Sequence, residues 1–284
     1  MKRRILRSIL FVLALAVFLC SGGAVVRYFL QMQAGAKQAG AVAQKVVSTV
    51  FIPSEQVLEQ EIGRETEATV GETEVEATGE VTDEASEAAP SYAPIRVDFD
   101  VLLSENPDVV AWLYVPDTPI HYPVVQAEDN AYYLHRLLDG SNNSAGTLFL
   151  DCRNAPDFSD WNSVIYGHNM LDDSMFGSLP DYETQAYFEA HPVLYLLTPE
   201  QDYAVELIAG FTTAPDASLY RSLCSPAEER EKLLAQWMES SDFSSDIRPT
   251  AEDRLVTLST CTYTFRNARY VVIGVLRPLD RVPE

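Results

Sequence analysis

The chain has 284 residues and a formal net charge of −22 at pH 7, and this charge is unevenly distributed. Residues 1–54 carry a net charge of +7, residues 55–90 carry −11 and residues 91–284 carry −18. So acidic a surface repels polyanions, which argues against nucleic acid as a partner. The cysteines are too few and too scattered for a disulfide scaffold, and no C-x-x-C pair supports a zinc or redox site. They are Cys20, Cys152, Cys224 and Cys261.

An uncharged apolar run near the N-terminus predicts a membrane segment. Residues 9–26 are dense in Leu, Val, Phe and Ala, and basic residues precede them. That length is just enough to span a bilayer, and the positive-inside rule places residues 1–8 in the cytoplasm. We interpret residues 9–30 as a signal anchor, which locates the chain in the cell membrane with its remaining part outside. A cleaved signal peptide is the alternative, because small residues follow a short apolar core.

Residues 31–90 differ in composition from the rest of the chain. They are rich in Ala, Glu, Gln, Thr and Val and have no aromatic residue after Phe51. Such a segment buries too little apolar surface to offset chain entropy, so we interpret it as an acidic low-complexity stalk. Its first part, residues 31–50, can be helical as a continuation of the membrane segment. A self-repelling spacer, or otherwise an interaction tail, is expected for residues 55–87, which implies that the domain works at a distance from the membrane.

Residues 91–284 are sufficient for one domain with a sizeable core, and their pattern is mostly β. Segments rich in β-branched and aromatic residues, separated by Asn, Asp, Gly or Pro, predict strands. These segments are residues 111–115, 146–150, 163–166, 193–197, 203–212, 255–259 and 269–276. Few of them come with a crossover helix, which argues against a doubly wound sheet. We therefore expect a mainly β fold, a β-barrel or closed sheet with helical decoration.

Helices are predicted over residues 99–105, 131–138 and 226–239. The last of them has the strongest start signal. Ser225 is its expected N-cap, Pro226 its first helical residue, and Glu228 stands three residues after Ser225 to close a capping box.

A strand that ends on a cysteine is the main chemical signal. Cys261 closes the run LVTLSTC, and a thiol attacks a carbonyl only as the thiolate, which needs a neighbouring base or cation. Arg266 and Arg269 follow in the chain, and Arg269 opens the next predicted strand. If the two strands are adjacent, its guanidinium comes near the sulfur and can hold a carbonyl or an oxyanion. Cys152 and Cys224 are interpreted as small buried hydrophobic residues.

Four histidines are available as the base. His168 lies in YGHNM, where a β-rich segment meets a turn and a polar ring can face a cleft. His121 and His191 lie beside prolines and His135 falls inside a predicted helix, so these three are interpreted as structural. The pairing of Cys with His in catalysis makes His168 the candidate base.

Longer stretches of the chain resemble the sortase family, and specifically its class B branch. They are NPDVVAWLYVPDTPIHYPVVQAEDNAYYL, GTLFLDCRN, NSVIYGHNM, MFGSL and TLSTCTYTFRNARYVVIGVL. The resemblance covers residues 95–277. It implies a closed eight-stranded sortase β-barrel with an N-terminal helical extension and a helix between strands 6 and 7. The predicted helix over residues 226–239 matches the last feature.

The resemblance also implies a reaction. Sortases are membrane-anchored cysteine transpeptidases of Gram-positive bacteria that cleave a C-terminal sorting motif after its threonine, keep the threonyl group as a thioester and pass it to an amine. By position, Cys261 is the nucleophile, His168 the general acid and then the base, and Arg269 the partner of the oxyanion or substrate carbonyl. Alignment on RYVVIGVL favours Arg269 over Arg266. The alternatives are a protease of the same mechanism, a pilin-polymerising sortase and a non-catalytic barrel that binds peptides or wall polymer.

Substrate-groove residues and partners follow from the same resemblance. The groove residues are Asn130, Leu134, Tyr166, Ser259 and Thr260, of which Leu134 and Tyr166 are alternatively core residues. The expected partners are secreted proteins with a C-terminal sorting signal, the amine of a lipid-linked peptidoglycan precursor, and the membrane. No metal ion or cofactor is expected. The acidic segment departs from the family by its length.

Overall fold

The computed structural model describes residues 2–50, 91–215, 219, 226–262, 264 and 266–281. Within residues 2–24 most side chains fall outside the description. The greater part of the predicted stalk, residues 51–90, therefore lies outside the described residues, as do Ser225 and Cys224.

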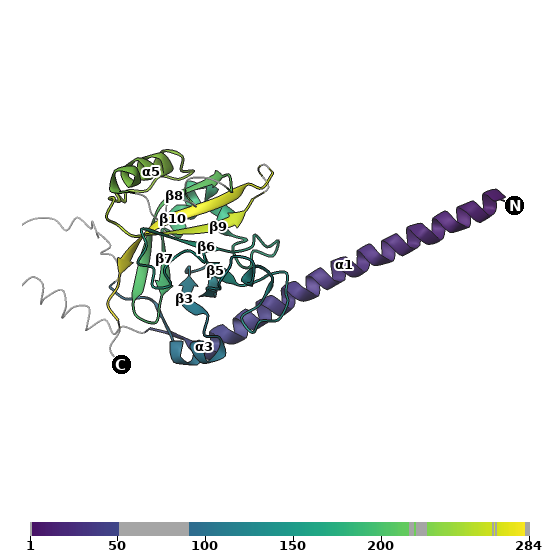
Figure 1. The fold of residues 1–284 in the computed structure, drawn as a ribbon, viewed down its shortest axis with the longest axis horizontal. Coiled ribbons are helices and arrows are strands. Elements are labelled where there is room, and N and C mark those ends of the chain that lie inside the picture. Colours follow the sequence, from purple (N-terminus) through teal and green to yellow (C-terminus); the bar gives the residue numbers. More distant parts are fainter. Residues whose placement is uncertain are drawn as a thin grey trace, which may run out of the picture.

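Eight strands close into a barrel in the order β10-β8-β7-β3-β4-β5-β6-β9, which confirms the predicted fold class (Figure 1). Most neighbours are antiparallel, whereas β4 with β5 and β6 with β9 are parallel. The strands are β3 (Val109–Tyr114), β4 (His121–Val125), β5 (Leu148–Leu150), β6 (Asn162–Tyr166), β7 (Val193–Leu197), β8 (Asp202–Thr213), β9 (Leu255–Cys261) and β10 (Arg269–Pro278). The helical elements around the barrel are α3 (Phe99–Glu105), the 3-10 turns η1 (Tyr133–His135) and η2 (Leu179–Glu183), α4 (Gln185–Ala190) and α5 (Ala227–Glu239).

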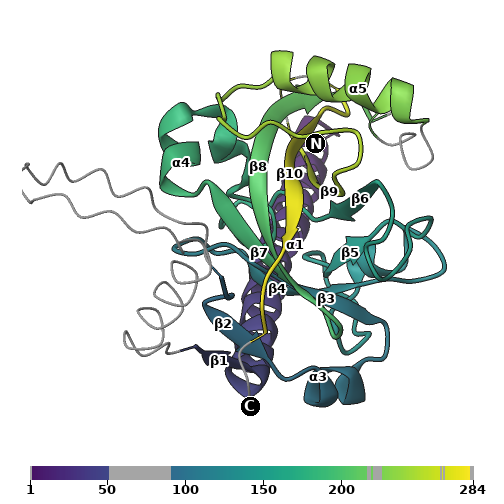
Figure 2. The ribbon, with the colours of Figure 1, turned by 90° about the vertical axis from the view of Figure 1, so that its left-hand side faces the viewer.

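The side chains of a barrel strand alternate between the inner and the outer face, and apolar side chains are buried on both faces. In β10, Val272 and Leu276 belong to the interior core, whereas Val271 and Ile273 pack in the outer cluster that also contains Trp237 of α5. Successive strand side chains point to opposite faces, so one strand serves both cores. Figure 2 shows α5 across the outer side of the barrel. Along the chain, α5 follows β8 and precedes β9, the sixth and seventh barrel strands, as predicted.

The start of α5 differs from the prediction by one residue. Pro226 is the N-cap and the helix begins at Ala227, with no side-chain capping bond at the N-cap. The fixed φ of proline suits either position, so the sequence pattern locates this boundary only to within a residue.

The strand β4 was not predicted, and it contains Pro123, which lacks a backbone donor and disfavours an interior strand. The register resolves this conflict. Pro123 pairs with Trp112 of β3, and the pairing of β4 with β5 starts only at Val124. The proline therefore occupies a part of β4 that has a partner on one side.

The predicted helix over residues 131–138 is wrong, since only the short turn η1 forms there. A helix would need its carbonyls to accept from residues four positions ahead. Instead, the Tyr133 carbonyl accepts from the Thr147 amide at 3.1 Å and the His135 carbonyl from the Asn143 amide at 3.0 Å. These bonds to a later segment unwind the helix and place η1 against the barrel.

The N-terminal helix α1 (Lys2–Val46) is continuous, and its C-terminal part lies beside the barrel while its N-terminal part extends away (Figure 1). Met32 is 5% exposed, and the Asn143 side chain donates to the Gln31 carbonyl at 2.8 Å. Strand β1 (Val47–Thr49) follows and pairs antiparallel with β2 (Ile95–Val97). Residues 31–46 are therefore helical, as the sequence allowed for the first part of the predicted stalk, and residues 47–49 form a strand of the domain.

The pairing of β1 with β2 also changes what residues 51–90 can do. The Val50 amide donates to the Pro94 carbonyl at 3.0 Å, so the chain leaves the domain and returns to it at one place. The length of the acidic segment therefore does not set the distance between α1 and the barrel.

Among the residues whose side chains the structure describes, no helix combines the length and the apolar character needed to cross a membrane.

Candidate active site

Cys261 and Arg269 face each other across two paired strands. Cys261 is the last residue of β9, Arg269 is the first of β10, and the antiparallel register places them directly opposite. Side chains at such positions have Cβ atoms about 5 Å apart. Cys261 is a free, half-buried cysteine. Arg266 lies exposed in the connecting loop, outside the ladder, so the geometry favours Arg269 as the partner of the thiol.

Hydrogen bonds join the turn that carries His168 to the end of β9. The Thr260 hydroxyl donates to the Gly167 carbonyl at 2.9 Å, and the Asn169 side chain donates to the Cys261 carbonyl at 2.8 Å. These bonds flank His168 on both sides in the chain. The parallel pairing of β6 with β9 thus brings the predicted nucleophile, base and arginine to one end of the barrel.

The orientation of the His168 ring is fixed by the turn η1. Its Nε2 lies 2.7 Å from the Leu134 carbonyl oxygen, which can only accept. Nε2 therefore carries the proton in the neutral ring, and Nδ1 is left as the basic atom. The His135 ring stacks on the same imidazole, with centroids 5.6 Å apart and an interplanar angle of 15°.

Burial lowers the pKa of His168 below its ordinary value, because desolvation disfavours the charged ring. The Leu134 carbonyl acts in the opposite direction, while His135 and Arg269 lower the pKa further. The neutral imidazole therefore predominates near pH 7, and it can accept a proton from a thiol or an amine.

The lowered pKa of His168 predicts a stability that falls in mild acid. The unfolded chain binds a proton at about pH 6.5 and the folded chain only at lower pH, so stability decreases as pH falls below about 6.5. Burial also lowers the pKa of His121, which adds to the effect. Urea unfolding at pH 7.5 and 5.5 should show this loss, and a smaller loss in His168→Gln. Equal losses in the two proteins would contradict the lowered pKa.

The residues predicted to line the substrate groove already hold internal contacts. Asn130 Oδ1 accepts the Cys152 amide at 2.8 Å. Tyr166 donates its hydroxyl to Asp151 at 2.9 Å, and the Leu134 side chain is half-buried against the core. Tyr166 and Leu134 therefore fit the alternative of core residues as well, and their contact with a substrate stays a prediction.

Ser259 and Thr260 are each about 1% exposed. The Thr260 hydroxyl is used by the Gly167 carbonyl, which joins β9 to the His168 turn. The structure thus assigns Thr260 a positioning contact, and a direct substrate contact for Ser259 and Thr260 stays a prediction.

An ion pair between the half-exposed Arg153 and the buried Asp151 lies next to Tyr166. The Asp151 side chain is fully buried and receives two bonds from the Arg153 guanidinium, at 2.8 and 2.7 Å. Burial alone would raise the pKa of Asp151, but Arg153 and the Tyr166 hydroxyl hold it below its ordinary value. Cys152 lies between the two charged residues and is half-exposed, so its interpretation as a buried thiol is wrong.

Several contacts in the site gave no signal in the sequence. The Leu134 carbonyl is a backbone atom, which any residue supplies, and His135 was interpreted as structural because a helix was predicted there. Asn169 had a weak signal, since it is polar and follows the candidate base in YGHNM.

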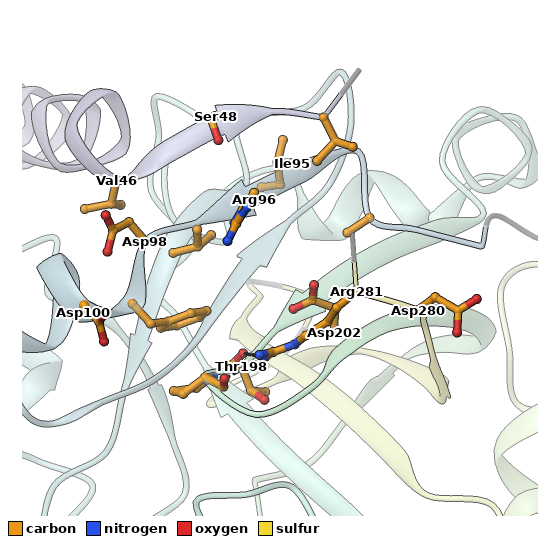
Figure 3. Close-up of a pocket in the computed structure, with 15 residues that line it drawn as sticks. Val46, Ser48, Ile95, Arg96, Asp98, Asp100, Thr198, Asp202, Asp280 and Arg281 are labelled. Carbon is orange, nitrogen blue, oxygen red and sulfur yellow. Dashed lines mark hydrogen bonds between the residues drawn. The ribbon is translucent and has the colours of Figure 1, made fainter. Parts of the chain in front are cut away.

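A cavity of about 530 Å³ lies elsewhere, between the β1 and β2 ribbon, the turn from β7 to β8 and the end of the described chain (Figure 3). Arg96, Asp202 and Arg281 line it, and Arg281 donates to the Thr198 carbonyl at 2.8 Å. No cysteine or histidine lines this cavity, so it does not hold the predicted pair of Cys nucleophile and His base. In the described part of the chain, no group of three or more His, Cys, Asp or Glu side chains could hold a metal ion.

Comparison with known proteins agrees with this geometry. The family model of the sortase domain matches residues 113–277. Sortase B of Listeria monocytogenes is 35% identical over 184 residues, which is 64% of this chain and 75% of that protein. Sortase B of Staphylococcus aureus is 29% identical over 182 residues, which is 63% of this chain and 75% of that protein.

Solved structures show the same similarity. A Staphylococcus aureus sortase B–substrate complex superposes with a TM-score of 0.61 at 28% identity, over 64% of this chain and 85% of that one. Sortase B of Clostridium perfringens superposes with a TM-score of 0.59 at 32% identity, over 63% of this chain and all of that one. The sortase domain thus spans more than half of the sequence, and the chain belongs to the sortase family of cysteine transpeptidases, within class B.

Proposed function

We propose that this class B sortase cleaves a C-terminal sorting motif after its threonine, holds the threonyl group as a thioester on Cys261 and transfers it to an amine of a cell-wall peptidoglycan precursor. The observation that carries the proposal is the register that sets Cys261 opposite Arg269, with the His168 turn bonded to the same strand end. A nucleophile, a base and an oxyanion partner are the groups that acyl transfer requires.

In the first half-reaction, His168 accepts the thiol proton and the Cys261 sulfur attacks the threonine carbonyl carbon. The oxygen of the tetrahedral intermediate gains negative charge, which the Arg269 guanidinium stabilises with its planar donors. The peptide bond breaks as His168 gives its proton to the leaving amine, and a thioester remains on Cys261.

In the second half-reaction, the acceptor amine attacks the thioester carbonyl and loses a proton to His168. The carbon–sulfur bond breaks, the thiolate recovers a proton and a new amide is released. A lowered pKa of His168 suits both steps, since the ring is neutral before each proton is accepted.

Two solved structures support this choice of partners by similarity. One is the Staphylococcus aureus sortase B–substrate complex, and another is a sortase B complexed with triglycine, a molecule with a free amine. By analogy we assign the acyl donor to secreted proteins with a sorting signal, and the acceptor to the amine of a lipid-linked wall precursor.

We further propose that residues 9–30 anchor the enzyme in the cell membrane, with residues 1–8 in the cytoplasm and the catalytic domain outside. Support comes from the uncharged run of residues 9–26 and from the exposure of Phe18 and Phe29, each more than half exposed on α1. Among the described side chains of α1, the first that packs on the domain core is Tyr28. The domain therefore lies close to the bilayer surface in this proposal.

The amine dependence of the products tests the proposed reaction. We expect the full-length protein in detergent to convert peptides of the N-P-x-T-x and x-P-x-T-G types to threonyl amides when triglycine is present. Mass spectrometry should also detect a peptide bound to Cys261. Cleavage to the free acid at the same rate with and without the amine would indicate a protease. The absence of both products with every peptide of the two types would contradict the proposal.

A further inference from the structure

One turn of the chain supplies two contacts to the candidate catalytic imidazole. The Leu134 carbonyl meets the ring edge of His168 at Nε2, and the neighbouring His135 ring covers its face. An edge contact alone leaves the ring free to tilt about the hydrogen bond. A ring stacked on the face opposes that tilt, so the two contacts together restrain both the tautomer and the plane of the imidazole.

Hydrogen bonds and close packing hold the turn η1 in place, so it can restrain the His168 ring. The Tyr133 hydroxyl donates to Asp108 at 2.7 Å, and the Asn106 side chain donates to that hydroxyl at 2.9 Å. Gly146 packs on the turn from the other side, where an added Cβ would lie 2.7 Å from the Leu134 carbonyl oxygen. His135 therefore projects from a fixed backbone, although its own side chain is exposed.

We propose that His135 is a positioning residue of this enzyme, whose ring keeps the His168 imidazole in the plane and tautomer that proton transfer to Cys261 and the amines requires. The inference rests on the role of His168 in the proposed function. It also reassigns His135, which the sequence pattern places in a structural helix.

The charge of the second ring gives the inference a pH signature. Among the described residues, the charged groups that act on His168 are His135 from η1 and Arg269 from β10, and Cys261 lies opposite Arg269 in the ladder. Arg136, the other basic residue beside the turn, lies over the Tyr132 ring, 4.7 Å from its centroid. A protonated His135 opposes protonation of His168, so removing it raises the pKa of His168 towards its ordinary value.

Variants of His135 separate the stacking from the charge. His135→Ala removes both, whereas His135→Phe keeps an aromatic face and removes only the charge. We expect His135→Ala to lower kcat for an active sorting peptide about tenfold with little change in KM, because part of the general acid–base contribution is lost. His135→Phe should recover most of kcat while the acid limb of the kcat/KM profile moves to higher pH.

His191→Phe is the matched control, since His191 caps the end of α4 and its ring packs on Tyr187 at 4.6 Å. It should leave kcat and the pH profile unchanged. An unchanged kcat and pH profile in His135→Ala would overturn the inference, and so would a His135→Phe variant as slow as His135→Ala.

Nitrogen-15 NMR of the His168 ring is a readout that does not need turnover. We expect one tautomer with a proton on Nε2 in the wild type, and a mixture or a raised pKa in His135→Ala. Unchanged ring signals would overturn the inference. If the wild type turns over no peptide but the ring signals change as expected, the proposed function fails while the positioning contact stands.

Discussion

Cys261→Ala is expected to abolish both cleavage and amide formation while the protein stays folded. The thiol is half-buried at the end of β9, so its removal deletes a nucleophile without opening a core cavity. We expect the free energy of unfolding to change by about 0.5 kcal/mol or less, as for substitutions outside the core. Mass spectrometry of the products and thermal unfolding by circular dichroism measure the two effects.

Cys152→Ala is the matched control for this experiment. Cys152 is also a free, half-exposed cysteine, but it follows β5 beside the Asp151 and Arg153 ion pair rather than the end of β9. It should retain activity near that of the wild type. An active Cys261→Ala protein would show that this cysteine is not the nucleophile. A loss of several kcal/mol of stability would show that it is a core residue.

Arg269→Lys is expected to lower the rate of acyl transfer by a factor on the order of 10², the cost of losing one oxyanion donor. Lysine keeps the positive charge but lacks the planar fork of donors that a carbonyl oxygen meets in a fixed direction. The register across from Cys261 holds Arg269 at one place, which makes the fork useful there. Steady-state kcat and KM for an active sorting peptide measure the effect.

Arg266→Lys provides the comparison, because it makes the same chemical change in the exposed loop between the two strands. Its kcat should stay within about twofold of the wild type, as expected for a solvated surface charge. A large loss in Arg266→Lys together with a normal Arg269→Lys would exchange the roles of the two arginines.

The strands of the barrel were predictable because their signal is local. The segment 193–197 was predicted with the bounds of β7, and the segment 269–276 lies within β10. A strand buried on both faces needs β-branched and aromatic side chains along its whole length, and the sequence displays them. The strand β4 was not predicted. A strand tolerates Pro123 only where one edge of the strand lacks a partner at that residue, and the sequence does not show which edges are paired.

In the candidate site, too, some residues were predictable from the sequence and others were not. Cys261, His168 and Arg269 were predicted from residue type and from the motifs that resemble the family, because acyl transfer requires a thiol, a base and a partner for the oxyanion. Their supports are the Leu134 carbonyl, the His135 ring and the Asn169 amide, and each acts on a residue more than 30 positions away in the chain. Sequence spacing carries no information about such contacts.

By itself, the sequence determined the mainly β fold, and it predicted which side chains react. Both depend on side-chain chemistry that is written in consecutive residues. Only the tertiary structure decided that residues 31–46 continue a helix onto the domain, that β1 pairs with β2, and that η1 replaces a predicted helix. In each case the deciding contact joins segments distant in the chain, such as Gln31 with Asn143, and its free energy exceeds the local preference only once the barrel has formed.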